Sequence, residues 1–99
     1  MVFFVLTKTF LNQDIAGKVL KLSEESFPIF KRQSGLQMIR MHKSHDNSHI
    51  MTYFAWDDKE SHENCMNSPD FAEMNKIWGE LMQNGSIKFE LSTYELFLE

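Results

Sequence analysis

The stretch from Ile50 to Phe71 constrains the fold more than any other part of the sequence, because it contains the end of one strand and the starts of two helices. Residues 50–56 are mostly β-branched or aromatic, which predicts a strand. Asp57 is expected to cap a short helix, with Glu60 reaching back as in a capping box. Ser68, directly before a proline, predicts a second helix start. A strand that feeds two successive helices is compatible with few architectures.

Apolar periodicity predicts the remaining elements. In chain order, we expect a strand over 2–11, a helix between Asn12 and Gly35, strands over 36–43 and 49–56, helices over 59–67 and 69–83, and a strand over 86–98. Asn12 should cap the first helix, Pro28 should kink or restart it, and Gly35 should end it in a left-handed conformation. This β-α-β-β-α-β order, with a split second helical region, predicts a ferredoxin-like α+β fold with one antiparallel four-stranded sheet.

Composition limits the partners and the compartment. The chain has 99 residues, which suggests one domain over 1–99, and a net charge of −4 with dispersed basic residues. This charge argues against nucleic-acid binding. No segment is apolar over the length that a membrane span needs, and Met1–Leu6 predicts a buried strand rather than a signal peptide. The single cysteine, Cys65, fits a reducing compartment, so we expect a cytoplasmic protein.

The first strand is apolar on both of its sides. Phe4, Leu6 and Phe10 share one side, while Phe3 and Val5 lie on the other. Helices can cover only one face of such a sheet, so the second face needs another apolar cover. RNA recognition would require an aromatic and basic pattern that this strand lacks. A homodimer that packs sheet against sheet is therefore the better prediction.

Three motifs together resemble the antibiotic biosynthesis monooxygenase family of dimeric α+β barrels. The first is Pro28 followed seven residues later by Gly35 before a strand. The second is the Trp-Asp-Asp-Lys-Glu-Ser sequence over 56–61, and the third is Asn-Ser-Pro-Asp-Phe over 67–71. The resemblance covers nearly the whole chain and implies the fold more strongly than the activity.

Family members include quinol monooxygenases that use no metal or flavin, haem-degrading enzymes, a sugar isomerase and proteins without a known reaction. The resemblance places Thr7, Cys65 and Asn75 where the haem-degrading branch has Asn, Trp and His. All three differ, so haem degradation is not expected. The quinol-oxidising branch often has His where this chain has Cys65 and Asp70, which is a departure from that branch too.

The resemblance implies a substrate pocket that includes Thr7, Cys65 and Asn75, and large aromatic side chains add Tyr53 and Trp78 as candidate lining residues. Asn75 stands beside a core stripe, so it lies either at the solvent edge or in a cavity. Cys65 is either a buried small hydrophobe or a pocket-lining thiol.

The histidines give no convincing metal site. His42, His45 and His49 flank a polar turn, and we expect solvated positions for all four histidines. The spacing of His62 and Cys65 on a helix could present two metal ligands, but no second close pair accompanies them. We therefore expect no metal.

Two functions from different classes remain open. The first is a cofactor-independent monooxygenase that acts on a quinol-type aromatic in an apolar pocket, with Asn75 and Tyr53 as catalytic candidates and His49 as a more distant base. Its substrate would be a small apolar or aromatic molecule, and it would need no cofactor. The alternative is a non-catalytic dimeric module that binds small molecules on the same scaffold.

Overall fold

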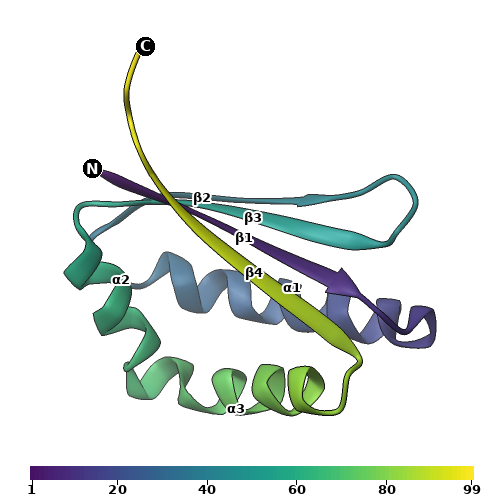
Figure 1. Ribbon diagram of the computed structural model, residues 1–99. Coiled ribbons are helices and arrows are strands. Elements are labelled where there is room, and N and C mark those ends of the chain that lie inside the picture. Colours follow the sequence, from purple (N-terminus) through teal and green to yellow (C-terminus); the bar gives the residue numbers. More distant parts are fainter.

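One antiparallel sheet carries all the helices on one of its faces (Figure 1). This computed structural model describes residues 1–99. The sheet has the order β2-β3-β1-β4, which gives the predicted ferredoxin-like α+β fold. The strands are β1 (Val2–Phe10), β2 (Leu36–Lys43), β3 (His49–Trp56) and β4 (Ile87–Glu95). The helical elements are the 3₁₀ turn η1 (Gln13–Ile15), α1 (Ala16–Lys31), α2 (Lys59–Met66) and α3 (Pro69–Gln83).

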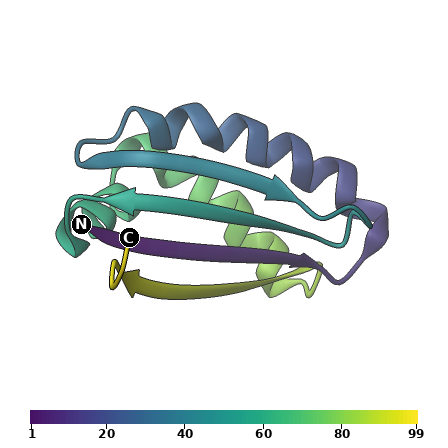
Figure 2. The ribbon, with the colours of Figure 1, turned by 90° about the horizontal axis from the view of Figure 1, so that it is seen from above.

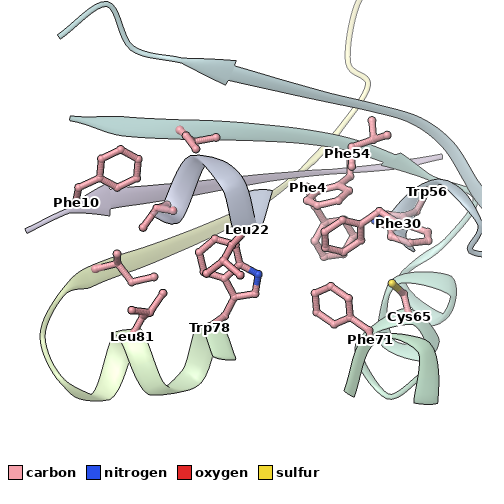
Figure 3. Close-up of a cluster of buried hydrophobic side chains, with 14 residues drawn as sticks. Phe4, Phe10, Leu22, Phe30, Phe54, Trp56, Cys65, Phe71, Trp78 and Leu81 are labelled. Atoms are coloured by element: carbon pink, nitrogen blue, oxygen red, sulfur yellow. The ribbon is translucent and has the colours of Figure 1, made fainter. Parts of the chain in front are cut away.

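The strand register determines which side chains face the helices. Leu6 in β1 lies opposite Thr52 in β3 and Leu91 in β4. Successive strand residues point to opposite faces, so Phe4, Lys8 and Phe10 lie on the same helix-facing side as Leu6, and all three are buried. Figure 3 shows the core that results, with aromatic side chains of the sheet meeting those of α1 and α3.

The centre of the fold follows the predicted pattern closely. β2, β3 and α3 have the predicted bounds. Ser68 caps α3 as expected, because its side chain accepts a hydrogen bond from the Asp70 amide at 3.2 Å. Asn12 also acts as a cap, accepting from the Asp14 amide at 3.0 Å, but the element that follows is η1, with α1 directly after it.

Three predicted helix boundaries are wrong. Asp58, rather than Asp57, caps α2 by accepting from the Ser61 amide, while the Asp57 carboxylate accepts from Gln37 Nε2 at 2.6 Å. The Asp57 amide still belongs to the strand end, since it donates to the Gly35 carbonyl. α1 runs through Pro28 without a break, so the predicted restart at this residue is wrong. Pro28 has no N–H, and it lies on the exposed side of the helix. α1 also ends at Lys31, before Gly35, whose positive φ of 87° serves the turn into β2 instead.

The sheet face opposite the helices is uncovered within this chain. We call it the open face, and its apolar part consists of Phe3 and Val5 in β1, Met51 and Tyr53 in β3, and Tyr94 in β4. Figure 2 looks onto this face and shows the four strands side by side with the helices behind them. β4 ends at Glu95 rather than at the predicted Leu98, and residues 96–99 rise from the sheet on the side away from the helices (Figure 1).

Candidate functional site

A cavity of about 170 Å³ lies between the sheet and the helices. All the strands that line it present their helix-facing side chains to it, and α1, α2 and α3 close the other side. Its lining residues are Leu6, Lys8, Phe30, Phe54, His62, Met66, Phe71, Asn75, Trp78, Phe89 and Leu91. Asn75 and Leu91 are the exposed members, so they mark the mouth of the cavity between α3 and β4.

Lys8 is the most unusual member of this lining. It is only 3% exposed, because the alternation of β1 places it in phase with the buried Phe4 and Phe10. Its ammonium lies 4.6 Å from the centre of the Trp78 ring, which is a cation–π contact. The one ion pair in the molecule joins Lys88 and Glu90, so no carboxylate neutralises Lys8. Burial therefore lowers the pKa of Lys8 from 10.5 to about 8.

A hydrogen bond to α1 fixes Trp78 in this position. The Trp78 indole N–H donates to Ser26 Oγ at 3.2 Å, and the Ser26 hydroxyl donates to the Leu22 carbonyl at 2.8 Å. Ser26 is fully buried, so this hydrogen bond satisfies both the indole N–H and the hydroxyl oxygen in an apolar environment. The indole is thereby oriented with one face towards the Lys8 ammonium.

His62 supplies the second titratable group of the cavity. Its ring stacks on Phe4 with 4.0 Å between the ring centres and meets Trp56 edge-on. The side chain is 9% exposed and its Nδ1 has no hydrogen-bond partner. Burial lowers the pKa of His62, and the nearby Glu63 offsets this effect in part. The imidazole is therefore neutral at pH 7, with a nitrogen free to accept a proton.

The structure brings only some of the predicted pocket residues together. Asn75 and Trp78 line the cavity. Thr7 and Tyr53 lie on the opposite face of the sheet, since Thr7 pairs across to Met51 and Tyr53 to Val5. His49 is exposed at the start of β3, where its Nδ1 is 2.9 Å from Ser48 Oγ.

Cys65 lies outside the cavity, beneath a polar surface hollow next to Ser61 and Asn64 on α2. It is 1% exposed and belongs to the hydrophobic core (Figure 3). Burial raises the pKa of its thiol to about 11, so the thiol is protonated at neutral pH. This environment is that of a buried hydrophobe, one of the two interpretations that the sequence left open.

The sequence analysis did not identify Lys8 and His62 as residues of the cavity. Lys8 could have been found, because a lysine in phase with Phe4 and Phe10 on a buried strand is an anomaly. The expected solvated position of His62 is wrong: α2 turns this side chain towards Phe4 and Trp56. His42, His45 and His49 are exposed as expected. No three His, Cys, Asp or Glu residues are grouped so that they could hold a metal ion.

The fold and the cavity define a class: a ferredoxin-like α+β protein with a small, mostly apolar cavity between its sheet and its helices. The chain is similar in structure to SnoaB, a cofactor-independent oxygenase from Streptomyces nogalater, with a TM-score of 0.78 and 14% identity over 99% of this chain and 94% of that one. It is also similar to Rv0793 from Mycobacterium tuberculosis, with a TM-score of 0.82 and 12% identity over 100% and 98% of the two chains. It is similar as well to an antibiotic biosynthesis monooxygenase, with a TM-score of 0.77 and 11% identity over 97% of this chain and 99% of that one.

This likeness shows that the chain has the fold of the proteins that its motifs resemble. No protein-family model and no curated protein matches the sequence. None of the helices combines the length and the apolar character that a membrane crossing requires.

Proposed function

We propose that this protein is a cofactor-independent monooxygenase of the antibiotic biosynthesis type that oxidises a small quinol-type aromatic. The observation that carries the proposal is the cavity, in which the neutral imidazole of His62 and the buried ammonium of Lys8 share a lining that is otherwise apolar, apart from Asn75 at the mouth. A mostly apolar lining of this kind limits contact with water and strengthens electrostatic interactions with a bound anion. The shared fold with SnoaB, a cofactor-independent oxygenase, supports the same reaction class.

The proposed reaction needs only the quinol and dioxygen. His62 accepts a proton from one quinol hydroxyl, and the electron-rich anion transfers one electron to dioxygen. Superoxide and the semiquinone then combine at a ring carbon that carries hydrogen, forming a C–O bond. The protonated His62 returns its proton to the outer peroxide oxygen, and cleavage of the O–O bond with loss of the ring hydrogen then releases one water and leaves a new ring carbonyl. One quinol and one dioxygen thus give one hydroxyquinone and one water.

The other polar groups would orient the substrate. The indole ring of Trp78 is fixed by its hydrogen bond to Ser26. A substrate ring can pack against it in offset or edge-on geometry. Asn75 stands at the mouth, where its amide can hold a second oxygen of the ring. Correct placement of the reacting atoms contributes strongly to the rate of such reactions.

Oxygen uptake with a panel of one-ring quinols tests this proposal. We expect uptake above a heat-inactivated control, formation of hydroxyquinone, and no return of oxygen when catalase is added, because water rather than peroxide is the product. His62→Gln should lower the rate about 100-fold, within the range for loss of a general base. His45→Gln, in the exposed turn, should leave it unchanged. Equal rates for both variants, or uptake that produces peroxide, would overturn the proposal.

The second candidate is a non-catalytic module that binds a small molecule in the same cavity. The departures at Cys65, Asp70 and Asn75 from the resembling enzymes favour it. Ligand-induced thermal stabilisation without any oxygen uptake would identify this function in place of the first.

We also propose that two copies pack through their open faces. The hollow on this face measures about 700 Å³, and its lining is almost entirely apolar, including Phe3, Tyr53 and Tyr94. Phe97 is 87% exposed, which is exceptional for a phenylalanine in an isolated chain. A second sheet would cover these side chains and place Leu96, Phe97 and Leu98 between the two copies.

A further inference from the structure

Lys8 places a positive charge in the cavity without any negative charge to balance it. Buried lysines are nearly always paired, because an isolated charge in an apolar interior is strongly unfavourable. Lys8 is 3% exposed, makes no ion pair, and has only the face of Trp78 as a favourable electrostatic neighbour. A cation–π contact with one ring does not balance the hydration that a buried ammonium loses.

No other residue around the cavity can supply the missing charge. α1 contributes Phe30, β3 contributes Phe54, and β4 contributes Phe89 and Leu91. α3 contributes the aromatic rings of Phe71 and Trp78 and the neutral amide of Asn75, and α2 contributes Met66 and His62, which is uncharged at pH 7. The lining therefore leaves Lys8 without a counter-charge, which an anion bound in the cavity would supply.

The cavity also limits the size and shape of that molecule. An apolar protein cavity of roughly 150 Å³ accommodates benzene, whereas drug-sized ligands need pockets of about 300–1,000 Å³. The volume of about 170 Å³ therefore suits one aromatic ring with small substituents. Phe54, Phe71, Trp78 and Phe89 provide aromatic walls for such a ring.

We propose that Lys8 is an anion-binding residue and that the cavity takes a one-ring hydroxyarene as its monoanion, with the ionised oxygen at the Lys8 ammonium. This inference uses the cavity of the proposed function and names its substrate class, but it holds for a binding module as well. In the oxygenase, Lys8 would favour the phenolate over the phenol, which is the form that gives an electron to dioxygen.

The test compares 4-nitrophenol, whose phenolate is coloured and forms near neutral pH, with its uncharged methyl ether 4-nitroanisole. Binding of both probes to the full chain is measured at pH 7 by quenching of tryptophan fluorescence, and ionisation of bound 4-nitrophenol is read from its absorbance. The variants are Lys8→Met, Lys8→Gln and, as a matched control, Lys88→Met, which removes an exposed lysine from the neighbouring strand. Two substitutions at position 8 guard against failure of one variant to fold.

We expect the wild-type protein to bind 4-nitrophenol at least tenfold more tightly than 4-nitroanisole and to increase its ionised fraction. Lys8→Met and Lys8→Gln should lose this tenfold preference while retaining 4-nitroanisole binding, and Lys88→Met should behave as the wild type. Binding of the phenolate should also weaken above pH 8, as Lys8 loses its proton. An unchanged preference in both Lys8 variants, or no preference in the wild type, would overturn the inference. Phenolate binding without oxygen uptake would instead overturn only the proposed oxygenase.

Discussion

At the residue scale, Lys8 should reduce the stability of the folded protein, although it is the proposed anion-binding residue of the cavity. The folded protein lowers the pKa of Lys8 from 10.5 to about 8, so the protonated side chain is disfavoured in the folded state. A shift of this size corresponds to roughly 3 kcal/mol at pH 7, from which the lost cation–π contact subtracts about 1 kcal/mol. Lys8→Met should therefore raise the free energy of unfolding by about 2 kcal/mol, measured by urea denaturation at fixed protein concentration.

The pH dependence distinguishes this explanation from better apolar packing alone. Between pH 8 and 10.5 the unfolded state binds more protons at Lys8 than the folded state does, so wild-type stability should rise with pH across this window. The advantage of Lys8→Met should shrink across the same window, and Lys88→Met should show no such trend. A constant advantage from pH 7 to pH 10.5 would contradict the assigned cause.

Two buried serines on α1 offer a second comparison at this scale. Ser26 accepts the Trp78 indole N–H, whereas the Ser23 hydroxyl has no partner. Ser26→Ala leaves the buried indole N–H unsatisfied and should lower the free energy of unfolding by about 1–3 kcal/mol. Ser23→Ala removes an unsatisfied group and should be neutral or stabilising. Equal losses for the two variants, measured by urea denaturation, would show that the hydrogen bond to Trp78 contributes little.

The residues of the site were harder to predict than the fold because their importance depends on burial and neighbours. Asn75 and Trp78 could be chosen from the sequence since both lie on or beside the apolar stripe of α3. Thr7 and Tyr53 were expected in the same pocket, but strand alternation places them on the opposite face of the sheet. His62 was missed because α2 is too short and polar for its buried side to be read from periodicity.

At the scale of elements, Gly35 lies in the turn from α1 into β2, where it packs against Ser61 of α2. It has a φ of 87°, and a Cβ there would lie 2.6 Å from Ser61 Cβ and would also overlap Ser61 Oγ. Gly35→Ala should thus lose about 1–2 kcal/mol for the left-handed backbone and a further amount for displacing α2. Gly85 has a similar φ of 78° with nothing near a Cβ, so Gly85→Ala should lose only the backbone contribution. Equal losses in thermal or urea unfolding would contradict a tight contact with Ser61.

Elements with long, regular patterns were predicted almost to the residue, whereas their junctions were not. β2, β3 and α3 have clear periodicity and a clear cap at Ser68. At the start of α2, two adjacent aspartates both fit the capping pattern, and the choice of Asp58 depends on a hydrogen bond between the Asp57 amide and the distant Gly35 carbonyl. Local sequence cannot show a contact of that kind.

At the scale of the whole molecule, the open face should control assembly. Val5 lies at the centre of this face, opposite Tyr53 on one side and Ser92 on the other. In a dimer that packs the two sheets together, Val5→Lys would bury an unpaired charge, which is strongly unfavourable. The variant should therefore sediment as a monomer at micromolar concentration, whereas the wild type should sediment as a dimer.

Thr9→Lys provides the matched control, because Thr9 lies on the same face of β1 but beside the polar residues His49 and Lys88. It should reduce dimerisation much less than Val5→Lys does. Both variants keep the helix-facing side of β1, so binding of 4-nitroanisole in the cavity reports whether the monomer remains folded. A wild-type protein that sediments as a folded monomer would overturn the proposed dimer, and Val5→Lys would then leave the sedimentation unchanged.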